Sequence, residues 1–495
     1  MHMIISDVFF PFLIRYYIAV LNAKRIHKSQ YHGQLYPTIF YLRRNGLVRA
    51  AHEYGIYFVL VRGAENKSIL DFEVKKDLLG SKNQVFTMRI GIVGLGYVGL
   101  STAVVLADQG NDLVCVDIDQ KRLEMLGSGI SPIYEVGLED MLKKNLSRMK
   151  LTTDYAALKG AEAIFICVPT PTTNNKFDIT YVASAIKKLV EIGVGGVVVI
   201  KSTVPPTAMN EIGAMLGKRP AMNPEFLKEG TAIRDTVNPD RVVVGADSDS
   251  DFEVVRKVWE FTKAPVLKVS PEEASMIKYA SNSLLAAKIS FINEVANICE
   301  KLPNCDIRNV SNGIGLDRRI GREFLNAGPG YGGSCFPKDT VALSSIAKDL
   351  KEETKIVDAA ISVNSARPKR IVDSLEGIMG SLQSKRVGVL GLAFKAETDD
   401  TRESVSLRII DELVGRGAKV IAYDPKARLD RQGVTVASSM KECIDSSEGV
   451  IIATEWKEFG GIEGALVGKY VVDTRRMLKP ALMDPSRFRA IGVMP

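Results

Sequence analysis

Apolar runs that stop at glycine, proline, serine or threonine recur along most of the chain. The run Arg89 to Val93 leads through a glycine-rich turn into a helical stretch, Leu100 to Gln109, and a second run spans Asp112 to Asp117. Further strands are expected at 163–168 and 196–200. Such runs are typical of buried parallel strands, whose carboxyl ends gather ligand-binding groups at one edge of a sheet. The pattern predicts an α/β fold with a doubly wound sheet.

A second series of apolar runs follows in the carboxyl-terminal part, at 385–392, 418–424, 449–454 and 470–473. Between the two series, the stretch Pro271 to Leu302 predicts one long helix that joins domains or subunits. We therefore expect two Rossmann-like doubly wound domains joined by a long central helix and a helical dimerisation domain. The expected boundaries are 1–87 for an N-terminal extension, 88–270 for a dinucleotide-binding domain, 271–380 for the central helices and 381–495 for a nucleotide-binding domain.

The first 87 residues differ in composition from the rest. They hold all four histidines and twelve basic against six acidic residues, so most of the net charge of +7 lies there. No nucleic-acid partner is therefore expected. The apolar opening, Met1 to Leu21, is broken by Asp7, Pro11 and Arg15, so we expect no membrane partner, with a span as the alternative. The extension is expected to be unrelated to the following domains or to be translated upstream sequence.

The six cysteines, at 115, 167, 299, 305, 335 and 443, show no CxxC pair and no metal-ligand spacing. Thiols that lie far apart are typical of reduced cysteines in a cytosolic protein. We expect no disulfide, no metal and a cytoplasmic location.

A glycine fingerprint follows the first strand. Gly94 permits a tight turn, Gly96 lets a pyrophosphate approach the backbone at a helix N-terminus, and Gly99 allows close packing of helix on strand. Asp117 ends the second strand, where a carboxylate reaches ribose hydroxyls and repels a 2′-phosphate. These positions predict NAD as the cofactor, with a doubly wound fold that binds no dinucleotide as the alternative. Thr203, after the strand 196–200, places a hydroxyl near the nicotinamide or caps a turn.

One cysteine lies in a glycine-rich turn ahead of an expected helix. In the stretch 328–339, Cys335 comes just before Pro337, which fits the first turn of a helix. The helix dipole and Lys338 are expected to lower the thiol pKa and favour a nucleophilic thiolate. Asp339, four residues on, shares the helix face of the sulfur. The alternative is a buried structural cysteine.

Two further pairs stand four residues apart. Glu225 and Glu229 face the same way if they lie on a helical turn and can then divide acid and base roles, or they are simply solvated. Lys278 and Asn282 project from the long apolar helix, where an oxyanion on a bound substrate would satisfy both. After the strand 385–392, Lys395 and the cluster 398–404 either meet a diphosphate or form an exposed, salt-bridged loop.

Residues 88–495 resemble the UDP-glucose/GDP-mannose dehydrogenase family through motifs that occur in family order. These motifs are the glycine fingerprint, Val-Pro-Thr-Pro, Lys-Ser-Thr-Val-Pro, Asn-Pro-Glu-Phe-Leu-Lys-Glu-Gly, Lys-Tyr-Ala-Ser-Asn, Arg-Ile-Gly, Gly-Gly-Ser-Cys-Phe-Pro-Lys-Asp and Asp-Asp-Thr-Arg-Glu-Ser. The resemblance implies a site for each reactant.

The implied roles are Cys335 as nucleophile, Lys278 and Asn282 as ligands of oxyanions, Asp339 and Thr203 as residues that position water, and Glu229 as a residue that assists hydrolysis. The implied NAD site comprises Gly94, Gly96, Tyr97, Val98, Gly99, Asp117, Thr203, Lys338 and Arg402. The implied sugar-nucleotide site comprises Glu225, Phe226, Leu227, Lys278, Asn282, Arg319, Tyr331, Gly332, Lys395 and Arg475. Because the family arginine matched by Arg319 reaches a partner subunit's sugar nucleotide, a homodimer or higher homo-oligomer is also implied.

The activity implied is the four-electron oxidation of a UDP-sugar's primary alcohol to a carboxylate by two NAD⁺, through a cysteine thiohemiacetal and thioester. UDP-glucose is the expected substrate, with a UDP-N-acetylhexosamine or GDP-mannose as alternatives. Two other classes stay open: a non-catalytic protein that binds NAD or a nucleotide sugar, and a two-electron reductase of the hydroxyacid type that would need no cysteine.

Overall fold

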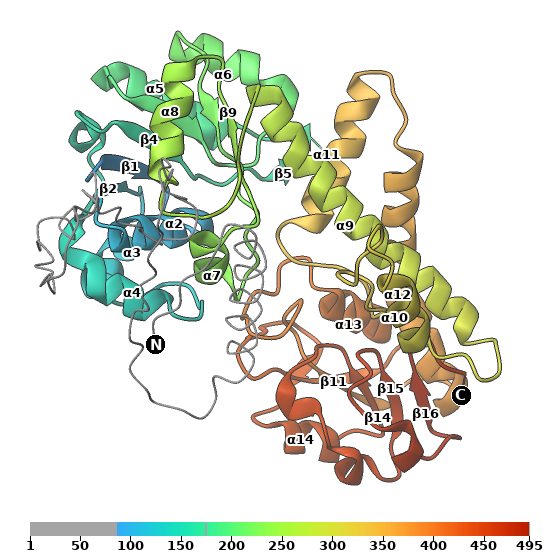
Figure 1. The fold of residues 1–495 in the computed structure, drawn as a ribbon. Helices are drawn as coiled ribbons and strands as arrows, with labels where there is room; N and C mark the ends of the chain where they lie inside the picture. Colours follow the sequence, from blue (N-terminus) through green and yellow to red (C-terminus); the bar gives the residue numbers. More distant parts are fainter. Residues whose placement is uncertain (1–86, 174–175, 495) are drawn as a thin grey trace, which may run out of the picture. The chain divides into compact units, whose positions relative to one another are not determined.

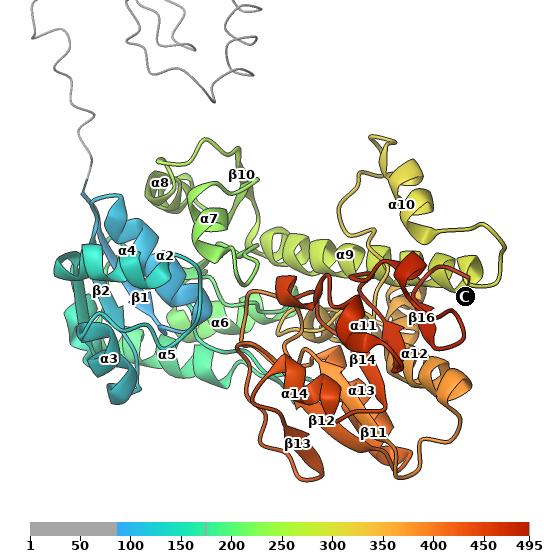
Figure 2. The same ribbon diagram turned by 90° about the horizontal axis from the view of Figure 1, so that it is seen from below.

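The computed structural model describes residues 87–173 and 176–494, which belong to one compact unit of the chain. The expected N-terminal extension, with its apolar opening, lies outside these residues apart from Thr87. Two sheets are linked by long helices (Figures 1 and 2). Within the described ranges, no helix combines the length and apolar character needed to cross a membrane. The predicted α/β class with two Rossmann-like sheets is confirmed.

The first sheet has eight strands and is parallel except where β8 meets β9. Its spatial order is β10 (Val266–Val269), β9 (Val242–Gly245), β8 (Ala221–Met222), β7 (Val197–Ile200), β4 (Ala163–Ile166), β1 (Arg89–Val93), β2 (Asp112–Val116) and β3 (Met149–Thr152). Since β1 lies between β2 and β4, the chain leaves its two sides in opposite directions, which is where open α/β sheets bind ligands.

Helices cover both faces of this sheet with apolar side chains. One face packs against α2 (Tyr97–Asp108), α3 (Gln120–Gly127), α4 (Leu138–Asn145) and α8 (Asp249–Val258). The other face packs against α5 (Thr180–Ile192) and α6 (Met209–Leu216). A short helix, α7 (Ala232–Val237), contacts α2, and β5 (Thr172–Thr173) pairs with β6 (Lys176–Phe177). The sheet is therefore doubly wound, as predicted.

The turn from β1 to α2 has the backbone that its glycines allow. Gly94 has a φ of +91° and donates its N–H to the carbonyl oxygen of Val116 at 2.8 Å. A Cβ on Gly99 would lie 1.9 Å from the carbonyl oxygen of Gly94, so helix and turn are in backbone contact. A Cβ on Gly96 would meet no atom within 4 Å, which leaves open space in front of the helix N-terminus.

Four helices follow the first sheet: α9 (Pro271–Cys299), α10 (Ile307–Gly315), α11 (Phe336–Asp349) and α12 (Lys355–Met379). The long helix α9 begins at a capping box, in which Ser270 and Glu273 each bond the other's backbone N–H. It ends at Cys299, three residues before the predicted end. In both views α9 runs from the first sheet toward the second, and it packs against both α11 and α12 (Figures 1 and 2).

The second sheet has six parallel strands. Their spatial order is β13 (Val434–Val436), β12 (Lys419–Tyr423), β11 (Arg386–Leu390), β14 (Gly449–Ile452), β15 (Tyr470–Asp473) and β16 (Phe488–Ala490). Helices α12 and α13 (Val405–Gly415) pack on one face and α14 (Met440–Asp445) packs on the other. The sequence analysis did not identify β13 and β16, which are only three residues long.

The two sheets carry the same hydrogen bond at their first turn. Asp117, after β2, accepts from the N–H of Leu95 at 2.7 Å, and Asp424, after β12, accepts from the N–H of Leu392 at 2.7 Å. In the second sheet the indole N–H of Trp456 also donates to Asp424, at 3.1 Å. Both carboxylates are therefore already bonded within the chain, and Asp117 also pairs with Arg122 at 2.9 Å.

We predict that Gly99→Ala destabilises the fold by about 1–3 kcal/mol, because the added methyl group forces α2 away from the turn. The control is Gly127→Ala at the end of α3, where a Cβ would meet no atom within 4 Å. Thermal unfolding should show a lower midpoint for Gly99→Ala and no loss for Gly127→Ala. Equal midpoints for the two variants would contradict the close contact.

Candidate active site

Cys335 lies immediately before the first turn of α11. It is the N-cap residue of that helix, half-buried, and its carbonyl oxygen accepts from the N–H of Asp339 at 2.9 Å. Two glycines of the preceding turn, Gly330 and Gly333, have φ values of +122° and +84°, which side chains disfavour. The glycine content of the motif therefore has a conformational cause, and the thiol sits at a helix start as expected.

Side chains from α12 hold this turn from behind. Asn364 accepts from the N–H of Tyr331 at 2.8 Å and donates to its carbonyl oxygen at 2.9 Å. Arg367 is 2% exposed and donates to the carbonyl oxygen of Gly328 at 2.7 and 3.1 Å. A Cβ on Gly332 would lie 2.4 Å from the carbonyl oxygen of Glu403, a residue of the loop after β11. The turn is thus fixed by both the central helices and the second half of the chain.

Two polar side chains of α9 reach the site from the other side. The ammonium of Lys278 lies 2.7 Å from a carboxylate oxygen of Glu225, and both side chains are almost fully buried. One turn later, the amide of Asn282 donates to the carboxylate of Asp339 at 2.6 Å. The structure therefore brings together four of the predicted residues, and each has a partner among the others.

The Lys278–Glu225 pair is ionised despite its burial. Burial opposes ionisation of Glu225, but the ammonium of Lys278 outweighs it and holds the pKa of the carboxyl below its ordinary value. Burial likewise opposes the charge of Lys278, whose pKa is nevertheless raised by Glu225, Cys335 and Asp339. A fixed cation therefore stands beside the thiol.

The expected low pKa of the thiol is wrong. Burial, together with the charges of Glu225 and Asp339, raises the pKa of Cys335 to about 11, and Lys278 only partly opposes this rise. Lys338, the cation expected to act on the thiol, instead bonds the carboxylate of Asp339 at 2.7 Å. At neutral pH the sulfur is protonated, so its attack on a carbonyl carbon requires transfer of the proton.

The expectation that Glu225 and Glu229 share a helical face is also wrong. Residues 223–228 form no helix, and the two carboxylates have different partners. Glu229 accepts from the hydroxyl of Ser334, the neighbour of Cys335, at 3.0 Å. Its other carboxylate oxygen is buried and has no hydrogen-bond partner within the described ranges.

Two cations of the second half hold Glu229. Lys395 donates to its carbonyl oxygen, and the guanidinium of Arg402 lies 3.5 Å from its carboxylate. Burial, together with the charge of Asp400, raises the pKa of Glu229 to about 7, against the opposing effects of Ser334 and Arg402. A carboxyl group that titrates near neutrality therefore lies beside the thiol. Lys395 is half-buried, whereas the side chain of Arg402 is 65% exposed and also pairs with Asp400 of its own loop at 2.6 Å.

Further predicted residues lie on α2 and in the loops that follow β7 and β8. Tyr97 and Val98 open α2, and the hydroxyl of Tyr97 bonds the carboxylate of Glu135. Thr203 is half-buried and follows β7. The ring of Phe226 stacks against the guanidinium of Arg241 at 3.8 Å, and the N–H of Leu227 donates to Glu225 at 2.7 Å.

Two predicted arginines differ in their setting. Arg475 donates to the carbonyl oxygen of Ala453 at 2.9 Å, and its guanidinium would lie 3.4 Å from a Cβ on Gly328, so it borders the cysteine turn. The side chain of Arg319 is 88% exposed and pairs with Asp317 at 2.6 Å. The structure therefore places Arg319 on the surface of this chain rather than with the other predicted residues.

Sequence analysis missed Lys201, which is 4% exposed at the end of β7. Its ammonium donates to Asn223 at 3.2 Å and lies 4.8 Å from the ring centroid of Trp259. Burial lowers its pKa to about 8. A lysine that ends a buried apolar strand was the available signal. Among the described residues, no cluster of three or more His, Cys, Asp or Glu side chains is arranged to hold a metal.

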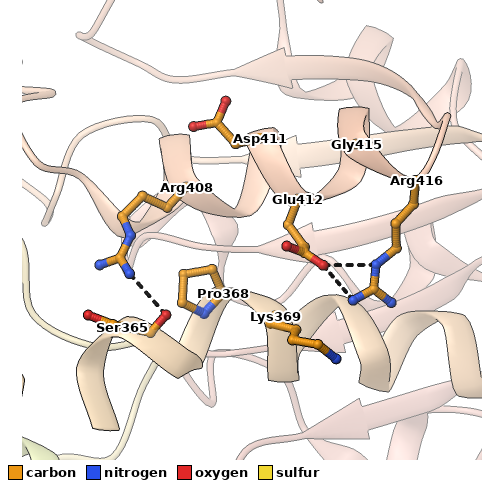
Figure 3. Close-up of a pocket in the computed structure, with 8 residues that line it drawn as sticks. All are labelled: Ser365, Pro368, Lys369, Arg408, Asp411, Glu412, Gly415 and Arg416. Atoms are coloured by element: carbon orange, nitrogen blue, oxygen red, sulfur yellow. Dashed lines mark hydrogen bonds and ion pairs between the residues drawn. The ribbon is translucent and has the colours of Figure 1, made fainter. Parts of the chain in front are cut away.

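A separate pocket lies between α12 and α13 and shares no residue with this site (Figure 3). Its lining comprises Ser365, Pro368, Lys369, Arg408, Asp411, Glu412, Gly415 and Arg416. Arg416 binds Glu412 at 2.6 Å, and Arg408 donates to the carbonyl oxygen of Ser365 at 3.0 Å (Figure 3). These charged groups are used within the chain.

We predict that Glu225→Gln increases the reactivity of Cys335, because the substitution removes a negative charge that raises the thiol pKa. Each unit by which the pKa falls increases the thiolate fraction about tenfold at pH 8. The measurement is the rate of alkylation of the Cys335 peptide by iodoacetamide between pH 6 and 11, followed by mass spectrometry. The exposed Glu211→Gln serves as the control. A wild-type rate that levels off below pH 9 would contradict the raised pKa.

Comparison with known proteins places this geometry in a family. Sequence models of the UDP-glucose/GDP-mannose dehydrogenase family match three stretches: its NAD binding domain at 88–263, its central domain at 272–366 and its UDP binding domain at 388–480. UDP-glucose 6-dehydrogenase of Rickettsia bellii is 40% identical over 428 residues, which cover 81% of this chain and 98% of that protein. UDP-glucose 6-dehydrogenase TuaD of Bacillus subtilis is 40% identical over 416 residues. The alignment covers 80% of this chain and 88% of that protein.

Solved structures agree with these matches. A UDP-glucose dehydrogenase of Pyrobaculum islandicum superposes with a TM-score of 0.77 at 37% identity, covering 83% of this chain and 99% of its own. A UDP-D-ManNAc dehydrogenase of Pyrococcus horikoshii gives a TM-score of 0.74 at 27% identity, covering 82% and 99%. The three domain models match in family order, and the relatives align over nearly their whole length. This chain therefore belongs to the UDP-glucose/GDP-mannose dehydrogenase family.

Proposed function

We propose that this chain is an NAD-dependent UDP-glucose 6-dehydrogenase, which oxidises the primary alcohol of the sugar to a carboxylate. The observation that carries the proposal is a half-buried thiol, Cys335, surrounded by the charges of Glu225, Lys278 and Asp339. A simple two-electron dehydrogenase has no use for such a thiol. The curated relatives cited above carry UDP-glucose 6-dehydrogenase as their name, which favours UDP-glucose over the other sugar nucleotides.

The turn after β1 fits a dinucleotide. Open space lies in front of the N-terminus of α2, where backbone N–H groups and the helix dipole favour a pyrophosphate, and a methyl group on Gly96 would intrude into that space. Asp117, at the end of β2, has the carboxylate that suits ribose hydroxyls. An NAD⁺ held there would supply the hydride acceptor for each oxidation, with a second NAD⁺ replacing the first NADH between the two.

The covalent steps on the sugar are assigned to the side chain of Cys335. The sulfur of Cys335 adds to the aldehyde carbon that the first oxidation leaves, while its proton moves to the sugar oxygen, which gives a thiohemiacetal. Loss of a second hydride and a proton gives a thioester, and water then releases the acid and restores the thiol. Covalent capture keeps the aldehyde in the site, so the second oxidation is intramolecular.

The neighbours of the sulfur fit the remaining tasks. Lys278 and Asn282 supply N–H donors for the oxygen on which negative charge develops. Glu229, with a pKa of about 7, suits a base that takes a proton from the attacking water. Asp339 and Thr203 are assigned to positioning that water. Arg475, Lys395 and Tyr331 border the turn where the sugar nucleotide would lie.

We expect purified protein to form two NADH per UDP-glucose consumed, and Cys335→Ser to form no uronate while it still binds NAD⁺. Absorbance at the NADH band, with UDP-N-acetylglucosamine, UDP-N-acetylmannosamine and GDP-mannose in parallel, measures both stoichiometry and preference. Cys305→Ser, another half-exposed thiol, is the matched control and should remain active. A fully active Cys335→Ser would overturn the cysteine assignment, and a higher kcat/KM on another sugar would overturn the assigned substrate.

We further propose that the protein is a homodimer formed through α9. This helix buries one side in the chain, yet it also exposes a row of apolar residues: Met276, Leu284, Phe291 and Ile298. Their spacing of seven or eight residues keeps them on one face. The row is continuous with the segment that carries Arg319, because Lys288 donates to the carbonyl oxygen of Ile320 at 3.1 Å. A second copy covering this face would bring the exposed Arg319 near the partner's site.

The double variant Leu284→Glu and Phe291→Glu is expected to be monomeric, because two charges on this face make its burial unfavourable. Sedimentation measures the mass, and circular dichroism checks that the fold is kept. The control is Val467→Glu, an apolar residue that is 79% exposed in the second half of the chain, which should leave the dimer intact. A double variant that stays dimeric would place the interface elsewhere.

A further inference from the structure

Two cysteine sulfurs are in contact at the far end of α9. Cys299 is the last residue of the helix and is buried, and Cys305 is half-exposed in the segment before α10. The thiol of Cys305 donates to the sulfur of Cys299 at 2.8 Å. The expectation that the thiols lie far apart is wrong for this pair. A small movement separates this contact from a disulfide, whose sulfurs lie about 2.05 Å apart.

Bonds on both sides hold the two sulfurs together. Beside Cys299, Glu300 binds Arg370 and accepts from the N–H of Gly492 at 3.0 Å. Beside Cys305, the carboxylate of Asp306 accepts from the guanidinium of Arg476 at 2.8 and 3.1 Å. Both ends of the connecting loop are therefore anchored to the carboxyl-terminal part of the chain, and closing the bond requires little rearrangement.

The pair is distinct from the proposed catalytic thiol. Cys335 lies at the start of α11, whereas Cys299 belongs to an apolar cluster with Ile292, Ile307 and Ile491 at the junction of α9 and α10. Cys115, Cys167 and Cys443 are buried, as is Cys299. Of the two residues in contact, Cys305 is the more exposed to solvent, so we expect its thiol to be the one that a reagent reaches first.

We propose that Cys299 and Cys305 form a reversible disulfide that ties the end of α9 to the start of α10. The co-reactant is a small-molecule disulfide. The sulfur of Cys305 attacks it, forming a mixed disulfide and releasing one thiol, and the sulfur of Cys299 then displaces the second thiol. Two protein thiols are oxidised, one disulfide is reduced to two thiols, and the two protons pass to the leaving thiolates.

The surroundings determine the order of these steps. Burial, the hydrogen bond from Cys305 and the charges of Asp306 and Glu300 raise the pKa of Cys299 to about 11. Cys299 is therefore a poor first nucleophile, but its contact with the other sulfur gives it a high effective concentration in the second step. Exchange should accelerate as the pH rises. The proposal is independent of the proposed enzymatic activity.

The sequence supplies a direct assay. Trypsin cleaves after Lys288, Lys301 and Arg308, so it places the two cysteines on the separate peptides 289–301 and 302–308. The native full-length protein is incubated with oxidised glutathione, its remaining thiols are blocked, and it is digested without reductant. We expect the thiol count to fall from the six of the sequence to four, with peptides 289–301 and 302–308 linked, and dithiothreitol to restore six.

Three variants serve as controls. Cys305→Ser should keep all five remaining thiols, Cys299→Ala should stop at a glutathione adduct on Cys305 with four free thiols, and Cys335→Ser should still give the linked peptides. Thermal unfolding of the oxidised wild type should show a midpoint several degrees above that of the reduced protein, because the crosslink restricts the unfolded chain. Cys305→Ser should show no such difference.

Stable glutathione adducts at Cys305 without linked peptides would overturn the proposal. A link that involves Cys335, or six thiols that persist after oxidation, would do the same. If the linked peptides are detected but the unfolding midpoint is unchanged, the disulfide does not stabilise the junction of α9 and α10. That result would not affect the dehydrogenase assignment.

Discussion

The arrangement of the reactive groups depends on the buried ion pair between Lys278 and Glu225. Each ion loses hydration energy on burial, so neither is stable there without the other, and removal of one partner leaves an uncompensated charge. The pair fixes the rotation of α9 against the loop that follows β8. One turn further, the same rotation directs Asn282 at Asp339 and so fixes α11, the helix that carries the thiol. A single constraint thereby positions groups from three separate segments.

The regular elements could be predicted because burial imposes a period on their residues. The strands 89–93 and 470–473 were predicted to the residue, and the predicted start of the long helix, Pro271, is the first residue of α9. Chemistry-bearing residues were identified by type and spacing, without knowledge of their partners. Glu225 and Glu229 show the limit, since their sequence spacing indicated one helical face and the chain places them in a loop with different partners.

What the sequence could not supply was the environment of each group. The pKa of the Cys335 thiol depends on burial by segments more than fifty residues away, among them the loop after β11, and local signals such as a helix start and a nearby lysine pointed in the opposite direction. Asn364 and Arg367, which hold the cysteine turn, lie on a helix whose sequence has no recognisable motif. The contact between Cys299 and Cys305 likewise depends on distant residues, because their neighbours Glu300 and Asp306 bond to Gly492 and Arg476 of the carboxyl-terminal segment.

The bonds around Glu229 have a consequence for the timing of the reaction. This residue belongs to the half of the chain that carries the first sheet, yet Lys395 and Arg402, which follow the second sheet's first strand, hold it in place. Ser334 also donates to Glu229, so the carboxylate is tied both to the neighbour of the sulfur and to the second half. In the proposed mechanism, separation of the halves would break the bonds from Lys395 and Arg402, and the water-activating carboxylate would lose its support. Hydrolysis would then be the step that depends on contact between the two halves of the chain.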